Sequence, residues 1–149
     1  KKGNERELKW IKSSYLKLPE NFKSWKVFIP KANGAGILGE VLSAPMIGEP
    51  YTGHTLTFLS IGNFNTREEA TAVLKYIQTK FARTLLGTLK VTQDNPKDTW
   101  ANVPMQDFTP DSDIDWSKSI PEIDAQLYAK YGLSEEEIAF IESMIKPMC

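Results

Sequence analysis

Three segments carry the signature of a helix start, and they constrain the fold more than any other feature of the sequence. In each, a Ser or Thr is followed three residues later by Glu, so that the hydroxyl can accept an amide proton while the carboxylate reaches back to the cap. These capping boxes begin at Thr66, Ser119 and Ser134. Apolar residues then recur at spacings of three and four, which predicts three amphipathic helices. The first should extend to about Gly87, and the second should end at Gly132.

β-branched and aromatic residues predict two strands, at residues 25–30 (WKVFIP) and 55–61 (TLTFLSI), and a short edge strand at 103–105. The Gly- and Pro-containing stretch between the first two predicts long irregular loops. Loosely spaced apolar residues at 5–16 predict a helix that leads from an upstream domain. The predicted class is therefore α+β, a mixed α/β fold in which a small sheet packs on one long helix and the chain ends in a helical hairpin.

Composition places the chain among ordinary soluble domains. It has 149 residues, 41% hydrophobic and 25% charged, which excludes disordered, collagen-like and disulfide-rich classes. No apolar run approaches the roughly 18 residues of a membrane span. The first residue is Lys1, which suggests a piece of a longer chain, and the lone Cys149 suits a reducing, cytoplasmic location. We expect a linker or helix over 1–22, an α/β domain over 23–118 and a C-terminal hairpin over 119–149 that packs on that domain.

Charge is divided sharply along the chain. Residues 1–92 hold 14 Lys and Arg against 7 Glu and no Asp, a net charge of +7, whereas residues 93–149 hold 4 Lys against 12 acidic residues, a net charge of −8. One interpretation is a basic surface for a polyanion, with an acidic part that stabilises the domain or repels that polyanion. The alternative is that the two halves pair with each other inside the fold.

No complete catalytic centre is visible in the sequence. His54 is the only histidine, so neither a nucleophilic triad nor a zinc site is supported, and no cofactor or metal is expected within these residues. The Pro110-Asp111 pair resembles the first half of a nuclease signature, but the second half is missing. Asn95-Pro96 resembles only the start of an amino-methyltransferase motif and is interpreted as a turn. A nuclease therefore stays a third hypothesis, which Mg-dependent cleavage would support.

Several polar and basic residues have the chemistry of polyanion contact. Lysines flank the first strand, a glycine-containing turn can bring backbone amides close to a phosphate, and further cations follow the long predicted helix. Asn33 and His54 are the candidate base readers, although a lone histidine is more often structural or simply exposed, and the lysines could equally form a solvated face. The candidate DNA-binding residues are Lys26, Lys31, Asn33, Gly34, Gly36, His54, Lys80 and Arg83.

Several segments of the sequence also resemble those of a known protein family. The segments that carry it are WKVFIPKANGAG (25–36), FLSIGNFNTREEA (58–70), YIQTKFAR (76–83), VPMQDF (103–108), DIDW (113–116) and YGLSEEEIAFI (131–141). They resemble the C-terminal region of bacterial restriction-modification enzymes, especially large adenine-methylating restriction endonucleases that combine methyltransferase and specificity functions. The resemblance covers nearly the whole chain from about Trp25, and it leaves the type I or type II assignment open.

The resemblance implies a target recognition role. In such enzymes the C-terminal module commonly contributes to DNA specificity, while the methyltransferase centre, with S-adenosylmethionine, and the Mg-dependent nuclease or motor lie upstream. The expected partners are double-stranded DNA and the upstream domains or subunits of the restriction-modification complex, with no membrane. The leading hypothesis is a non-catalytic DNA-binding specificity module. The alternative is a subunit-docking or structural C-terminal domain of the same system.

Overall fold

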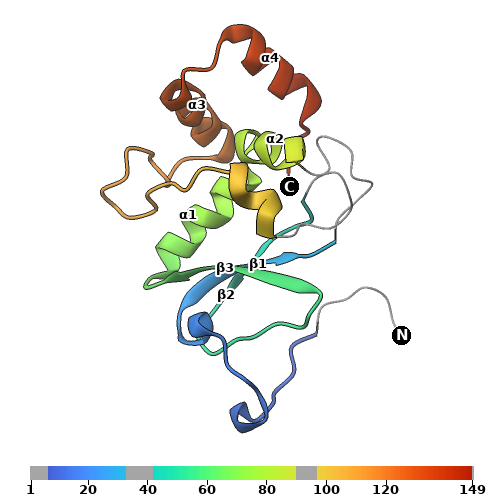
Figure 1. The fold of residues 1–149 in the computed structure, drawn as a ribbon. Helices are drawn as coiled ribbons and strands as arrows, with labels where there is room; N and C mark the ends of the chain where they lie inside the picture. The colour runs from blue at the N-terminus through green and yellow to red at the C-terminus, as the bar shows by residue number, and fades with distance from the viewer. Residues whose placement is uncertain (1–6, 33–41, 90–96, 149) are drawn as a thin grey trace.

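A computed structural model of the protein describes residues 7–32, 42–89 and 97–148. Its strands form one antiparallel sheet in the order β2-β1-β3, in which β1 (Trp25–Pro30) lies between β2 (Met46–Gly48) and β3 (Phe58–Phe64). The α-helices of the described residues lie on one side of this sheet, and the N-terminal segment lies on the other (Figure 1). The predicted α+β class is confirmed.

The central strand β1 has the predicted bounds, and its side chains alternate between two covered faces. Val27 and Ile29 are fully buried in the core that the helices cover, whereas Lys26 and Phe28 point to the opposite face, which we call the outer face of the sheet. β3 starts three residues later than predicted, because the preceding residues form a turn closed by the Phe58 amide on the Thr55 carbonyl (3.1 Å). β2 falls in the stretch that was expected to be irregular.

The predicted single helix from Thr66 to about Gly87 is two helices, α1 (Arg67–Gln78) and α2 (Lys80–Leu89). Its start is confirmed, since the Thr66 hydroxyl accepts from the Glu69 amide (3.2 Å). The break is at Thr79, whose ψ of 151° is extended and whose hydroxyl donates to the Tyr76 carbonyl (2.6 Å) while accepting from the Ala82 amide (3.1 Å). One buried side chain therefore satisfies groups at the end of one helix and at the start of the next.

The C-terminal helical pair is as predicted. α3 (Ile120–Tyr131) and α4 (Glu135–Met144) each begin with a complete capping box, at Ser119 and Ser134. α3 ends at Gly132, which has the left-handed φ of 64° that glycine adopts without steric cost.

Two predicted elements are absent from the described residues. Within the predicted helix at 5–16, residues 7–16 show only a short 3-10 turn, η1 (Ser13–Tyr15), and every side chain from 7 to 20 is exposed. A helix with no surface to pack against has too little to stabilise it. Residues 103–105 form no strand, because the Val103 amide donates to the Trp100 carbonyl (3.0 Å) and closes the 3-10 helix η3 (Lys97–Asn102).

One hydrophobic core joins the sheet to all four helices. β1 contributes Val27 and Ile29, and the helices contribute apolar side chains at the spacings that the sequence shows. Buried members from the helices include Val73, Tyr76, Ile77, Phe81, Ala82, Leu86, Ile123, Leu127 and Ile141, and Ile145 follows directly after α4. None of the helices within the described residues has the length and apolar character needed to cross a membrane.

A glycine in β3 provides a test of this fold. Gly62 has a left-handed φ of 89° beside the register shift between β1 and β3, and an added Cβ would lie 1.8 Å from the Phe64 ring. We expect Gly62→Ala to lower the free energy of unfolding by about 1–3 kcal/mol in urea titrations. Gly53→Ala is the matched control, since no atom lies within 4 Å of an added Cβ there. Equal effects of the two substitutions would contradict the described geometry.

Candidate functional site

Lys26 was predicted to contact DNA, and the structure places it inside the protein. Its side chain is 1% exposed, and its ammonium group lies within hydrogen-bond distance of four backbone carbonyls. These are the carbonyls of Asn21 (3.0 Å), Phe22 (3.1 Å), Ser24 (3.1 Å) and Glu49 (3.2 Å). Burial lowers the pKa of Lys26. This lysine fastens η2 (Glu20–Lys23) and the segment after β2 to the outer face, so it does not reach a phosphate.

Lys80 and Arg83 on α2 also turn inward, toward the acidic end of the chain. Lys80 forms a salt bridge with Glu142 of α4 and lies 3.3 Å from the Glu142 carbonyl. Arg83 is 4% exposed and donates from Nη2 to the Lys146 carbonyl (2.7 Å) and from Nε to the Gln78 carbonyl (3.1 Å). The expectation that these two side chains form part of a cationic face is therefore corrected, because their charges are taken up by the C-terminal segment and by the end of α1.

Asp124 on α3 is a buried acid at the point where α1 ends and α2 begins. It was not among the residues predicted from the sequence. Its carboxylate accepts from the Lys80 amide (3.0 Å) and the Phe81 amide (2.9 Å), which are free donors at the start of α2. Burial raises the pKa of Asp124, while the two amide hydrogen bonds oppose that rise. The sequence feature that could have indicated its burial is its position beside Ile123, on the apolar stripe of a predicted helix.

Two further lysines fasten loops to helices. Lys75 of α1 donates to the carbonyls of Trp116 (2.8 Å), Ser117 (3.2 Å) and Lys118 (2.8 Å). These hydrogen bonds hold the turn before α3 in place. Lys130 of α3 lies 2.8 Å from the Asp113 carboxylate. Both lysines of the helical layer therefore stabilise the fold by holding loop residues against helices.

Lys31 and His54 are the two predicted residues whose segments the structure brings to one end of the β1–β3 pair. The Lys31 amide donates to the Thr57 carbonyl (2.9 Å), which extends the β1–β3 pairing beyond Pro30. The exposed His54 ring makes edge contacts with Phe28 and Phe58, at centroid distances of 5.1 and 6.5 Å. Segments 23 positions apart in sequence thus lie at the same end of the β1–β3 pair. The other predicted residues of this region, Asn33, Gly34 and Gly36, lie outside the described residues.

The hydrogen bond of His54 selects one of its tautomers. Nδ1 lies 2.9 Å from the Thr55 carbonyl, and a carbonyl only accepts, so Nδ1 carries the proton. Nε2 is then the ring nitrogen that remains for a ligand. Close by on the outer face, Tyr51 is 69% exposed and has a φ of 64°, the one left-handed non-glycine residue of the described chain. Strained backbone of this kind is concentrated at functional loops.

No family model matches the chain, and neither a curated protein nor a solved structure matches it. Within the described residues, no group of three or more His, Cys, Asp or Glu side chains is placed to hold a metal ion.

The Lys80–Glu142 pair makes stability depend on pH. The hydrogen bond from Lys80, with a second from Tyr128, holds the pKa of Glu142 below its ordinary value of 4.5. Because the folded pKa is the lower one, this contribution is present above the unfolded pKa and is lost as the pH falls through the folded pKa. We expect Glu142→Gln to lower the free energy of unfolding by about 0.5–1 kcal/mol at neutral pH, since Glu142 is partly exposed.

The loss in free energy of unfolding caused by Glu142→Gln should vanish at pH values below the folded pKa of Glu142, where the wild-type carboxylate is also neutral. Urea unfolding at a series of pH values measures it, and Glu135→Gln, an exposed acid on the same helix, is the control. A deficit that stays constant with pH would show that the pair contributes through packing and not through charge.

Proposed function

We infer that the chain is a DNA-contacting specificity module of a restriction-modification enzyme, and that its DNA contacts come from the end of the β1–β3 pair where Lys31 and His54 lie. The observation that carries this inference is the hydrogen bond between the Lys31 amide and the Thr57 carbonyl. It joins the last described residues after β1, which precede Asn33 in the sequence, to the turn that holds His54, and both segments contain residues predicted to contact DNA. α2 has no part in the proposed surface.

The distribution of charge supports this side of the molecule. Within the described residues, neither Lys23 nor Lys31 forms a salt bridge, and both belong to the sheet side. Residues 97–148, which include α3 and α4 at the opposite end of the molecule (Figure 1), carry 11 of the 16 acidic side chains of the described residues and would repel a phosphate backbone. A duplex is therefore steered toward the sheet and away from the helical pair.

The chemistry of Lys31 and His54 suits the two kinds of contact that a specificity module needs. Lys31 supplies a cation that can pair with a phosphate and release counterions, which gives affinity without sequence preference. His54 offers Nε2 at a fixed orientation, because Nδ1 is held by the Thr55 carbonyl and the ring rests on Phe28. A single fixed acceptor or donor of this kind can discriminate base edges.

Titration with duplex DNA at several salt concentrations tests this proposal. Lys31→Ala should weaken binding to all duplexes and lower the salt slope by about 1, because one phosphate contact is removed. His54→Ala should leave the salt slope unchanged and reduce the difference in affinity between duplexes of different sequence. Fluorescence anisotropy on a panel of mixed-sequence duplexes measures both quantities.

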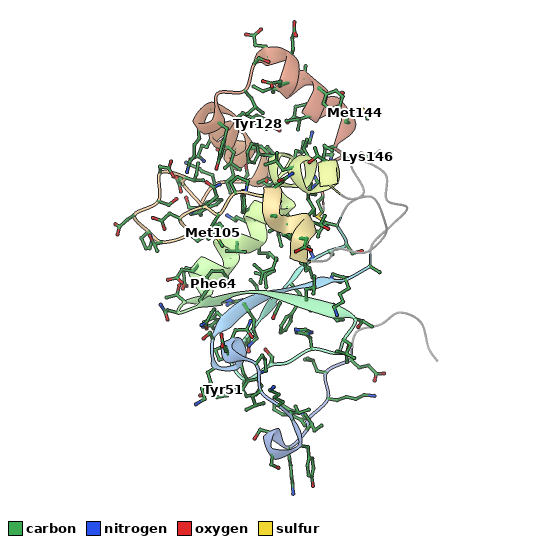
Figure 2. The ribbon with its side chains drawn as sticks, in the orientation of Figure 1. Tyr51, Phe64, Met105, Tyr128, Met144 and Lys146 are labelled. Atoms are coloured by element: carbon green, nitrogen blue, oxygen red, sulfur yellow. The ribbon has the colours of Figure 1, made fainter. Side chains whose placement is uncertain are left out.

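The matched control is Lys146→Ala, which removes an exposed cation at the other end of the molecule (Figure 2). It should bind DNA like the wild type. An unchanged salt slope for Lys31→Ala, or an equal loss for Lys146→Ala, would contradict the assignment of DNA contact to the end of the β1–β3 pair.

A further inference from the structure

Residues 7–18 form an apolar arm that makes no buried contact within the described chain. We call this segment the arm. Its side chains Leu8 and Trp10 are 96% and 102% exposed, and the remaining large apolar members also face solvent. Single exposed apolar residues are common on protein surfaces, but a contiguous group of this size marks an interaction surface. The exposed apolar residues of the arm are Leu8, Trp10, Ile11, Tyr15, Leu16 and Leu18.

An apolar groove lies at the other end of the molecule, between α2 and α4. It has a volume of about 450 Å³, and its floor and walls come from Phe81, Leu85, Leu133, Phe140 and Ile141. Phe140 remains 52% exposed in this groove, although it belongs to a short helix that the core holds through Ile141. We call this feature the α2–α4 groove. Its size and lining suit apolar side chains of a docked segment.

The arm and the α2–α4 groove are complementary in charge as well as in polarity. The arm carries Lys9, Lys12 and Lys17 against the single acid Glu7. The groove is rimmed by Glu136 and Glu137, which follow Glu135 in the acidic first turn of α4. Complementary charges around an apolar centre are the pattern that selects one partner over others.

The two features lie at opposite ends of the same molecule. In Figure 1 the arm is on the sheet side, near the N-terminus, whereas α4 forms the far edge of the helical layer. Figure 2 shows the same separation between Tyr51, on the sheet side, and Met144 of α4. An arm that follows the described path cannot fill the groove of its own chain, but it can enter the groove of a neighbour.

We propose that the protein forms a homodimer by reciprocal arm exchange, in which the arm of each copy occupies the α2–α4 groove of the other. Such an exchange is self-complementary, so two identical contacts close a two-fold dimer. Trp10 and Tyr15 of one arm offer roughly 300–500 Å² for burial. Two arms together offer roughly 600–1,000 Å², a large part of the roughly 1,200–2,000 Å² that specific interfaces bury.

Sedimentation equilibrium of the full chain tests the dimer, and zero-length crosslinking tests its geometry. A carbodiimide joins Lys amines to Glu carboxylates that touch, and a mixture of ¹⁴N and ¹⁵N protein identifies crosslinks between copies by mass spectrometry. The expected hybrid peptides connect Lys9, Lys12 or Lys17 with one of residues 135–137. A chain that stays monomeric up to about 100 µM, or a dimer whose hybrid crosslinks lie elsewhere, would overturn the proposal.

Substitutions on both sides of the contact should weaken the dimer alike. We expect Trp10→Ala in the arm and Phe140→Ala in the groove each to raise the dimer dissociation constant about tenfold or more. Both side chains are exposed, so folding should be retained, which circular dichroism checks. Met105→Ala is the matched control, because Met105 is 84% exposed and belongs to neither feature. A dimer weakened equally by all three substitutions would overturn arm exchange.

Discussion

The carboxylate of Asp124 on the first two amides of α2 is the interaction on which the arrangement of the helices depends. The apolar stripe of the sequence runs without interruption from α1 into α2, yet the backbone is extended at Thr79. That break leaves donors at the start of α2 and acceptors at the end of α1, and groups of this kind cannot remain buried without partners. Asp124 satisfies the donors from α3, and Arg83 satisfies the Gln78 carbonyl on the other side. The C-terminal pair is thereby tied to the sheet domain.

The same junction explains part of the division of charge along the sequence, because basic and acidic segments contact each other there. The basic and acidic parts of the chain meet inside the fold, where Lys80 pairs with Glu142 and Arg83 reaches the Lys146 carbonyl. Lys26 and Lys75 likewise hold backbone carbonyls. A buried cation with several carbonyl acceptors contributes to one defined structure, and it is costly to leave without them. The exposed cations of the described residues are divided between the sheet side and the helical side, so the surface keeps only part of the asymmetry that the sequence shows. They are Lys9, Lys12, Lys17 and Lys23 on the sheet side, and Arg67, Lys118, Lys130 and Lys146 on or beside the helices.

Sequence patterns succeeded where short-range chemistry decides the structure. The capping hydroxyls of Ser119 and Ser134, and the glycine that ends α3, act within four residues of their partners. The helix break was not predictable in the same way, because Thr79 is compatible with a continuing helix and its partners come from later in the chain. Lys26 stands between apolar neighbours in a central strand, which is a signal for burial on both faces. Which carbonyls would surround it depends on η2 and on the segment after β2.

The candidate site was predicted only in part, for a related reason. The sequence shows which residues are basic, but the pairing of Lys80 and Arg83 depends on where α4 packs. The segments of Lys31 and His54 lie near each other because antiparallel pairing of β1 with β3 places the end of β1 beside the start of β3.

The most direct measurement of the central claim is the free energy of unfolding of Asp124→Ala, compared with Asp124→Asn. If Asp124 joins the C-terminal pair to α2, the alanine variant should lose about 2–3 kcal/mol, and the asparagine variant, which keeps one acceptor oxygen, should lose less. A loss below about 0.5 kcal/mol for the alanine variant would contradict the account, because surface substitutions of no structural importance produce changes of that size.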